Sequence, residues 1–116
     1  MCENILTAIA CYLEQYDDYV HLISGDFNCD LSISDKVASC INKFIDDYSL
    51  HRCDELFDKT ALMTYINPAL NHNSHIDYML ISCRERALHF DVLDLAVNFS
   101  DHLPLSACFA YNVCDN

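Results

Sequence analysis

The chain has 116 residues, of which 53% are hydrophobic, and its 18 acidic and 6 basic residues give a formal net charge of −12. This length allows one small domain or a piece of a larger one, with enough apolar residues for a packed core. The charge argues against a module that binds nucleic acid by neutralising phosphates, because such modules concentrate Lys and Arg. It does not exclude an enzyme whose carboxylates work with a divalent metal.

The eight cysteines are not arranged like a disulfide framework or a zinc site. No secretory signal opens the chain, no CxxC pair occurs, and the most apolar opening stretch, residues 5–13, is too short to span a bilayer. Several cysteines lie within apolar patterns, where a free Cys behaves as a small hydrophobe. We therefore expect reduced thiols in an intracellular protein that does not enter a membrane. The sequence does not determine whether it reaches the nucleus.

Two stretches predict amphipathic helices. Residues 3–17 and 34–48 both repeat apolar side chains at helical spacing. Ser32 or Ser34 is expected to cap the second helix.

The remaining apolar stretches predict strands. Residues 19–24 suit a buried strand that ends at Gly25, the single glycine, where we expect a backbone conformation or a close approach that a side chain would prevent. Further along the chain, the expected elements are a short strand and a turn in 50–57, two paired strands in 61–66 and 74–81, and strands in 87–97 and 103–113.

This order of elements predicts an α/β fold of the α+β type, with a mainly antiparallel sheet and helices on one face. The other face of such a sheet also needs cover. The sequence predicts no further helix to supply it, so we expect the chain to be one layer of a larger structure.

Asp26 and Asn28 follow the first predicted strand. In extended backbone, residues two apart project to the same side, where a carboxylate and a carboxamide could orient a water molecule. The alternative is an ordinary turn, which Gly, Asp and Asn all favour.

Asp77 lies inside an otherwise apolar strand. A carboxylate there needs a partner, and a histidine is the natural one, because a buried Asp can set its tautomer. The alternative is an Asp that faces water from an edge strand.

Asp101 and His102 precede the last predicted strand, whose beginning suits Pro104. From a loop, both side chains can reach one site: His102 could donate to a phosphate oxygen, and Asp101 could hold a metal or its water. The alternative is an ordinary acidic loop.

Taken in order, these motifs resemble the endonuclease/exonuclease/phosphatase family. They are Gly-Asp-Phe-Asn at 25–28, Ile-Asp-Tyr at 76–78 and Ser-Asp-His-x-Pro at 100–104. Residues 64–80 look most like the endonucleases of non-LTR retrotransposons. The resemblance implies a four-layer sandwich of two packed sheets flanked by helices, and hydrolysis of phosphodiesters with Mg²⁺ or Mn²⁺.

The resemblance also implies roles for particular residues. Asp26 would align the attacking water, and Asn28 would steady the phosphate. Asp77 would orient His102, which would bind a phosphate oxygen and stabilise developing charge. These four are the expected catalytic residues of a DNA endonuclease.

Two further residues have roles in the same comparison. Asp101 would help to hold the metal, and His75 stands where an Arg or Lys that contacts substrate is common. The family's N-terminal half, with its metal-binding Glu, has no counterpart in the sequence. We therefore expect the chain to be the C-terminal half of the domain, with impaired catalytic activity on its own. Its sheet is expected to pair with a complementary half or with a second copy of the chain.

Two other functions fit the same motifs. The chain could be an inactive remnant that serves as an interaction module, or a phosphoesterase that acts on a small phosphorylated substrate. Loss of turnover on mutation of His102 would indicate an enzyme and not an inactive remnant. Preference for a small phosphorylated head group over DNA would indicate the phosphoesterase.

Overall fold

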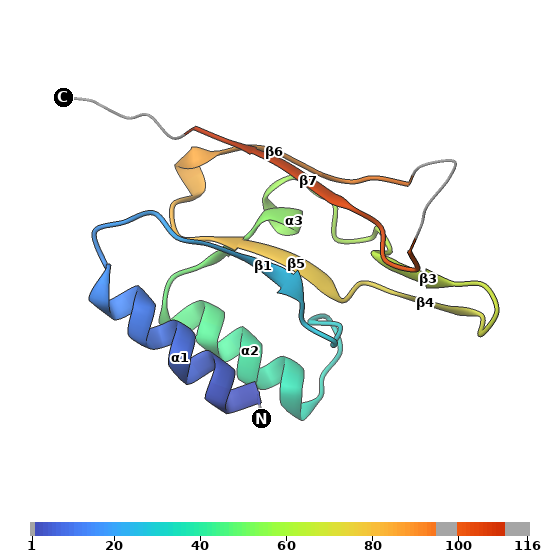
Figure 1. Cartoon of the computed structure of the whole chain (residues 1–116), viewed down its shortest axis with the longest axis horizontal. Coiled ribbons are helices and arrows are strands. Elements are labelled where there is room, and N and C mark those ends of the chain that lie inside the picture. The colour runs from blue at the N-terminus through green and yellow to red at the C-terminus, as the bar shows by residue number, and fades with distance from the viewer. Residues whose placement is uncertain (1, 95–99, 111–116) are drawn as a thin grey trace.

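A computed structural model describes residues 2–94 and 100–110 and shows an α+β chain with antiparallel sheets and few helices (Figure 1). The helices of this part are α1 (Cys2–Gln15), α2 (Lys36–Asp47), α3 (Cys53–Leu56) and a 3-10 turn η1 (Arg84–Arg86). Its strands are β1 (Leu22–Asp26), β2 (His51–Arg52), β3 (Tyr65–Asn67), β4 (His72–Ser74), β5 (Asp77–Ile81), β6 (Ala87–Val92) and β7 (Leu105–Phe109). No helix in these residues is long and apolar enough to cross a membrane.

The central sheet has the order β1-β5-β2, and both pairings are antiparallel. Its register places Asp26 opposite Asp77 and Leu22 opposite Ile81. Figure 1 shows α1 and α2 side by side on one face of this sheet, with α3 and the β6–β7 hairpin on the other. The β3–β4 hairpin extends from the end where Asp26 and Asp77 lie.

Alternate side chains of β5 pack into two separate hydrophobic cores. Tyr78 and Leu80 point to the helices, whereas Ile81 points to the β6–β7 hairpin, because successive side chains of a strand face opposite ways. The first core is built from Leu13, Leu31, Ala38, Ile41, Phe44, Ile45, Leu50, Tyr78 and Leu80. The second contains Cys53, Ile81, Phe90, Val92 and Leu103.

This arrangement corrects the expectation that nothing remained to cover the second face of the sheet. The last two strands do not extend the sheet that contains β5. They form a separate two-stranded sheet that folds back across it, with Phe90 only 1% exposed. The second face is covered by a second sheet, and the number of predicted helices does not reveal how the strands pair.

Both predicted helices are confirmed, but the predicted cap of the second is wrong. Asp35 caps α2, with extended backbone and a side chain that accepts a 2.8 Å hydrogen bond from the Ala38 N–H. A carboxylate is as effective as a hydroxyl at this position and also favours the positive end of the helix dipole, so Ser32 and Ser34 are not needed.

The predicted strand 74–81 is wrong as one element. Residues 72–74 form β4 and pair with β3, and the chain then breaks before β5, which pairs with β1 and β2. The break occurs because the N–H groups of Ile76 and Asp77 both donate to the hydroxyl of Thr64. The parts of the predicted last strands that fall at 95–97 and 111–113 lie outside the described residues.

The first strand begins later than predicted and continues through Gly25 to Asp26. Gly25 has φ +157°, and a Cβ built on it meets no atom within 4 Å. Of the two reasons expected for this glycine, the structure supports the backbone conformation and not a close approach.

Replacement of Gly25 by Ala should therefore destabilise the fold by about 1 kcal/mol or more, because an L side chain rarely adopts this φ. Urea unfolding would measure it, with Ser24→Ala in the same exposed strand as the control. Equal midpoints for the two variants would show that the φ of residue 25 imposes no cost.

Candidate functional site

Asp77 and His102 are in direct contact. The Nδ1 atom of His102 lies 3.0 and 3.2 Å from the two carboxylate oxygens of Asp77, which is only 9% exposed. Asp77 lies on the face of β5 that also carries Ile81, toward the β6–β7 hairpin, and the loop before β7 brings His102 to it. The sequence predicted a histidine partner for this buried carboxylate, and the structure shows that it is His102.

The backbone around His102 is fixed on the β3 side. Tyr65 forms an antiparallel bridge with His102, and their rings meet edge to face with centroids 5.0 Å apart. The His102 N–H also donates to the Ser100 hydroxyl over 3.1 Å. These contacts leave the imidazole about one third exposed, with its Nδ1 edge turned to Asp77.

Asp26 completes a group of three side chains. It is the last residue of β1 and faces Asp77 across the strand pair, and its Oδ2 lies 3.6 Å from Nε2 of His102. One potential ligand atom from each residue lies within 4.8 Å of the others. Like charges directly opposite on paired strands are unfavourable. An imidazolium between the two carboxylates relieves that repulsion.

The electrostatics favour a protonated imidazole. The hydrogen bond that His102 donates to Asp77 is the largest cause that raises the pKa of His102 above its ordinary value; desolvation opposes it, and the negative charges of Asp77, Asp26 and Asp101 raise the pKa further. The ring is therefore suited to carry a positive charge and to donate from Nε2.

Asn28 does not extend the strand, and the turn alternative is correct. Its φ is +56°, and its N–H donates to Oδ1 of Asp26 over 2.8 Å. The short polar side chains of Asn and Asp tolerate and favour such local turns. The turn holds the carboxylate of Asp26 in place, but the two side chains do not project together from extended backbone.

Asp101 and His75 lie outside the group of three. Asp101 is exposed, and its backbone carbonyl accepts a hydrogen bond from Ile66. His75 is 3% exposed, and its ring stacks on Tyr78 with centroids 4.8 Å apart. Because β5 starts only at Asp77, residue 75 is not constrained by strand alternation and turns inward. This placement does not fit the predicted contact of His75 with substrate.

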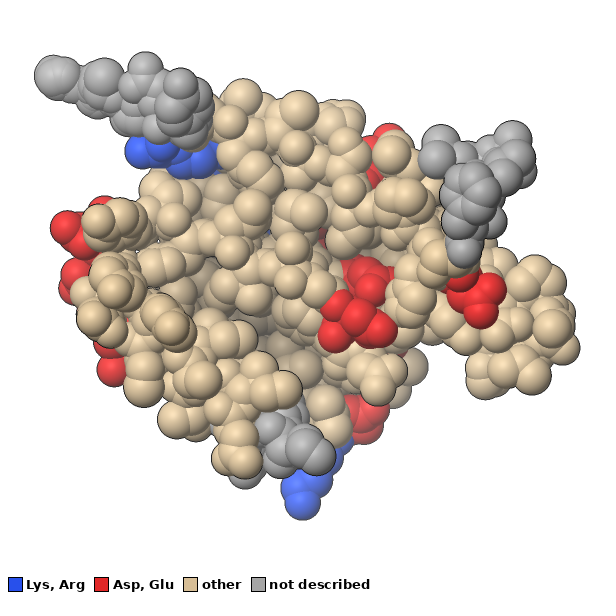
Figure 2. All heavy atoms as spheres, viewed as in Figure 1, with Lys and Arg blue, Asp and Glu red and all other residues tan. Residues whose placement is uncertain are grey.

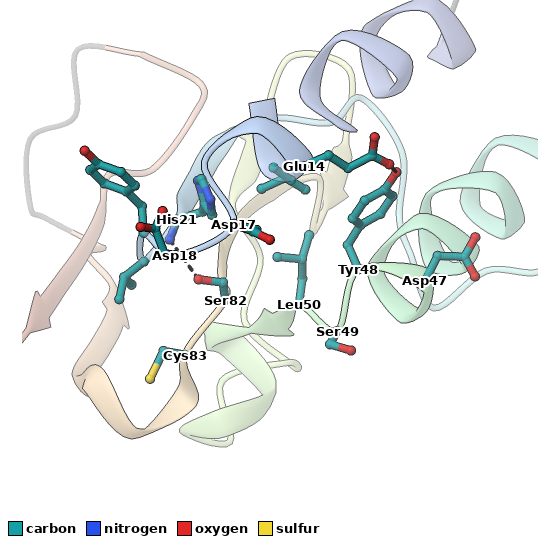
Figure 3. A pocket seen from close by; sticks show the side chains of 13 residues that line it. Glu14, Asp17, Asp18, His21, Asp47, Tyr48, Ser49, Leu50, Ser82 and Cys83 are labelled. Atoms are coloured by element: carbon teal, nitrogen blue, oxygen red, sulfur yellow. Dashed lines mark hydrogen bonds between the residues drawn. The ribbon is translucent and has the colours of Figure 1, made fainter. Parts of the chain in front are cut away.

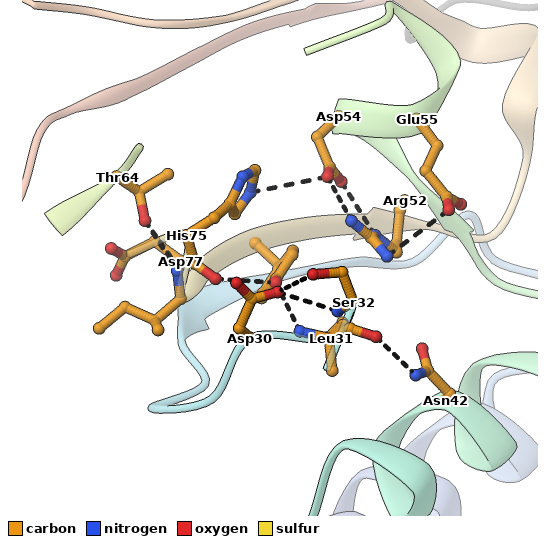
Figure 4. Close-up of polar contacts among 12 residues, drawn as sticks. Asp30, Leu31, Ser32, Asn42, Arg52, Asp54, Glu55, Thr64, His75 and Asp77 are labelled. Carbon is orange, nitrogen blue, oxygen red and sulfur yellow. Dashed lines mark hydrogen bonds and ion pairs between the residues drawn. The ribbon is translucent and has the colours of Figure 1, made fainter. Parts of the chain in front are cut away.

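The structure also contains a buried charged cluster that the sequence did not reveal (Figure 4). Arg52 donates to Asp54 from Nε over 3.1 Å and from Nη2 over 2.5 Å, and their side chains are 11% and 1% exposed. His75 places Nε2 at 3.6 Å from Asp54, and within residues 2–94 and 100–110 neither ring nitrogen has a hydrogen-bond partner. Arg52 and Asp54 lie in a stretch rich in charged residues, which normally indicates the protein surface. No sequence pattern therefore predicts that they are buried.

Loss of one partner in this buried pair should be costly. Asp54→Ala removes the buried carboxylate that binds Arg52 and leaves the guanidinium only its longer contact with the exposed Glu55, so it should reduce the free energy of unfolding by about 3–5 kcal/mol. Asp47→Ala, which breaks the exposed Lys43–Asp47 pair, is the matched control and should cost less than about 1 kcal/mol. Chemical denaturation of the two variants would compare them, and similar losses would contradict the assignment of a structural role to Asp54.

An open groove of about 570 Å³ lies at the opposite end of the central sheet, near the start of β1 and the end of β5 (Figure 3). Its lining includes the carboxylates of Glu14, Asp17, Asp18 and Asp47, and Tyr48 donates to Glu14 over 2.7 Å. None of the group of three lines it. Its acidic character does not suit an anionic ligand, so we do not include it in the site.

The group of three does not make a magnesium site by itself. Asp77 and His102 already engage each other, and one oxygen of Asp26 accepts a hydrogen bond from the turn. Mg²⁺ takes six ligands in near-octahedral geometry and favours oxygen. Asp26, Asp77 and His102 alone therefore do not supply the ligands of Mg²⁺, and Asp101, the predicted metal ligand, is not among the three.

Comparison with known proteins adds no assignment to this geometry. No protein-family model matches the chain, and no curated protein matches it.

The Asp77–His102 contact makes a prediction that titration can check. The pKa of His102, followed by NMR of its ring protons, should lie above the ordinary histidine value of about 6.5 and should fall when Asp77 is changed to Asn. Because the folded pKa lies above the unfolded value of about 6.5, this interaction stabilises the fold fully below that pH. The stabilisation is lost as the pH rises through the folded pKa. A His102→Gln variant should lack this loss, and a His102 pKa at or below its ordinary value would contradict the contact.

Proposed function

We propose that the chain is part of a phosphodiesterase of the endonuclease/exonuclease/phosphatase family, closest to the DNA endonucleases of non-LTR retrotransposons. The observation that carries the proposal is the contact of His102 with Asp77 and Asp26, three residues from the three motifs of the resemblance. The order of those motifs along the chain is the second support.

The geometry gives each residue a chemical task. Asp77 accepts from Nδ1–H of His102 and favours the protonated ring, whose Nε2–H can then be donated to a phosphate oxygen. The 3.6 Å separation from Asp26 is longer than a hydrogen bond, so Nε2–H is free to turn to another acceptor. Asp26, with its side chain 45% exposed, is the candidate to accept a proton from the attacking water.

Metal and DNA belong to the proposal through the resemblance alone. Mg²⁺ or Mn²⁺ would need oxygen ligands beyond the group of three, and the family's N-terminal half is where they are expected. Figure 2 shows acidic side chains gathered near the end of β1, whereas basic side chains on this face lie at its rim. Contacts that neutralise DNA phosphates are therefore also expected from outside this face.

We propose in addition that the chain contributes one side of a four-layer sandwich. In the described residues, β1 has a strand partner on only one side, and its outer edge is open to pairing. A strand edge of this kind pairs readily with another chain. A complementary half of the domain, or a second copy, is the expected partner.

Nicking of supercoiled plasmid with Mg²⁺ or Mn²⁺ tests the function. The folded chain should nick slowly, since its metal ligands are incomplete, and His102→Ala should reduce the rate by roughly 100-fold or more through loss of the phosphate-binding proton. His72→Ala, which removes an exposed histidine of β4, is the matched control and should leave the rate unchanged.

Two other outcomes would redirect the proposal. A folded protein that never nicks, with or without His102, would contradict an endonuclease in these residues and favour the inactive interaction module, which the incomplete donor set also supports. Hydrolysis of a small phosphate ester in place of DNA, dependent on His102, would favour a phosphoesterase.

A further inference from the structure

Thr64 is the most enclosed polar residue near the candidate site. It is 0% exposed, and its hydroxyl oxygen accepts hydrogen bonds from the N–H groups of Ile76 over 2.9 Å and Asp77 over 3.1 Å (Figure 4). Burial of a hydroxyl is unfavourable unless it is hydrogen-bonded. Here the two bonds take up the backbone donors that are left where the chain passes from β4 to β5.

The backbone of Thr64 makes two further hydrogen bonds. Its N–H donates to the Ser74 carbonyl over 2.9 Å, and its carbonyl accepts from the Leu103 N–H over 2.8 Å. Thr64 therefore contacts the segment that enters β5 on one side and the residue directly after His102 on the other. These are the two segments that supply the Asp77–His102 contact.

This position makes Thr64 a bridge within the candidate site. The 3.0 Å contact between Nδ1 of His102 and the carboxylate of Asp77 joins two segments that are 25 residues apart in the sequence. The contact therefore depends on the interactions that hold one segment against the other. A displacement of about 1 Å would break the hydrogen bond, and displacements of that size can cost catalysis on the order of 100-fold. Tyr65 adds a second support through its bridge to His102.

We propose that Thr64 is a positioning residue whose hydroxyl sets the main chain of Asp77 against the loop that carries His102. It acts through backbone amides and does not touch substrate. Its consequence for catalysis rests on the proposed function, whereas its effect on the Asp77–His102 contact does not.

The tautomer of His102 reports this effect without any activity assay. At a pH well above the pKa of His102, the neutral ring should carry its proton on Nδ1, because Asp77 accepts it there. In Thr64→Val, which keeps the shape of the side chain but removes the hydroxyl, the ring should become a mixture of tautomers, seen in its ¹⁵N chemical shifts. Thr64→Ser retains the hydroxyl and should restore the single Nδ1–H tautomer.

Two results would overturn the proposal. One is a folded Thr64→Val protein that keeps the single tautomer, since a merely structural hydroxyl would lower stability without altering His102. The other is a folded Thr64→Ser protein that fails to restore it. Thr60→Val, which removes the hydroxyl of an exposed threonine, is the control for loss of a threonine hydroxyl.

A measurement on the wild-type protein covers the case in which Thr64→Val does not fold. The amide protons of Ile76 and Asp77 should exchange with solvent as slowly as those paired in the β1–β5 ladder, because the buried hydroxyl holds them. Exchange as fast as in an exposed loop would overturn the proposal.

The catalytic consequence is tested separately. If the chain nicks DNA, Thr64→Val should lower kcat by about 100-fold with little change in KM, and Thr64→Ser should recover most of it. A change in tautomer without nicking by any variant would uphold the positioning role and contradict the proposed function. Unchanged kcat together with an altered tautomer would overturn the claim that the position of His102 matters for turnover.

Discussion

The structure depends on one strand that is buried on both faces and begins with a carboxylate. Alternate residues of β5 enter two cores, with Tyr78 among the helices and Ile81 against the β6–β7 hairpin. Asp77 shares the hairpin face and is only 9% exposed, so it is largely shielded from solvent. A buried carboxylate is unfavourable unless it is paired. The loop before β7 must therefore bring a cation or a donor to it, and His102 meets that requirement.

The resulting site has an internal tension. His102 lies between two carboxylates, which favour its protonated form, and the proposed function needs that form to bind a phosphate oxygen. The same carboxylates repel that phosphate, and so does the net charge of −12. A phosphodiesterase could resolve this tension with a metal cation and with basic residues on another surface.

The two histidines expected at the site show how burial decides a role. His75 is two residues from Asp77 in sequence, yet it stacks on Tyr78 and approaches Asp54 in the core. His102 is 25 residues away and makes the hydrogen bond. Proximity in sequence does not predict the partner, because the change of direction between β4 and β5 turns His75 to the helix side. The uncharged Thr64 fixes that change of direction, because its hydroxyl accepts hydrogen bonds from the N–H groups of Ile76 and Asp77.

By itself the sequence determined the two amphipathic helices and the antiparallel α+β class, because apolar periodicity is a local property. It left two alternatives for Asp77, a histidine partner or an edge position that faces water, and the structure shows the partner. It also left open the turn at Asn28, which the structure selects. Only the tertiary structure decided that β6 and β7 cover the central sheet, that Asp54 and Arg52 are buried and that His102 lies between Asp77 and Asp26. These outcomes depend on strand register and on which faces pack together. Both are set by contacts between residues far apart in the chain, which no local pattern encodes.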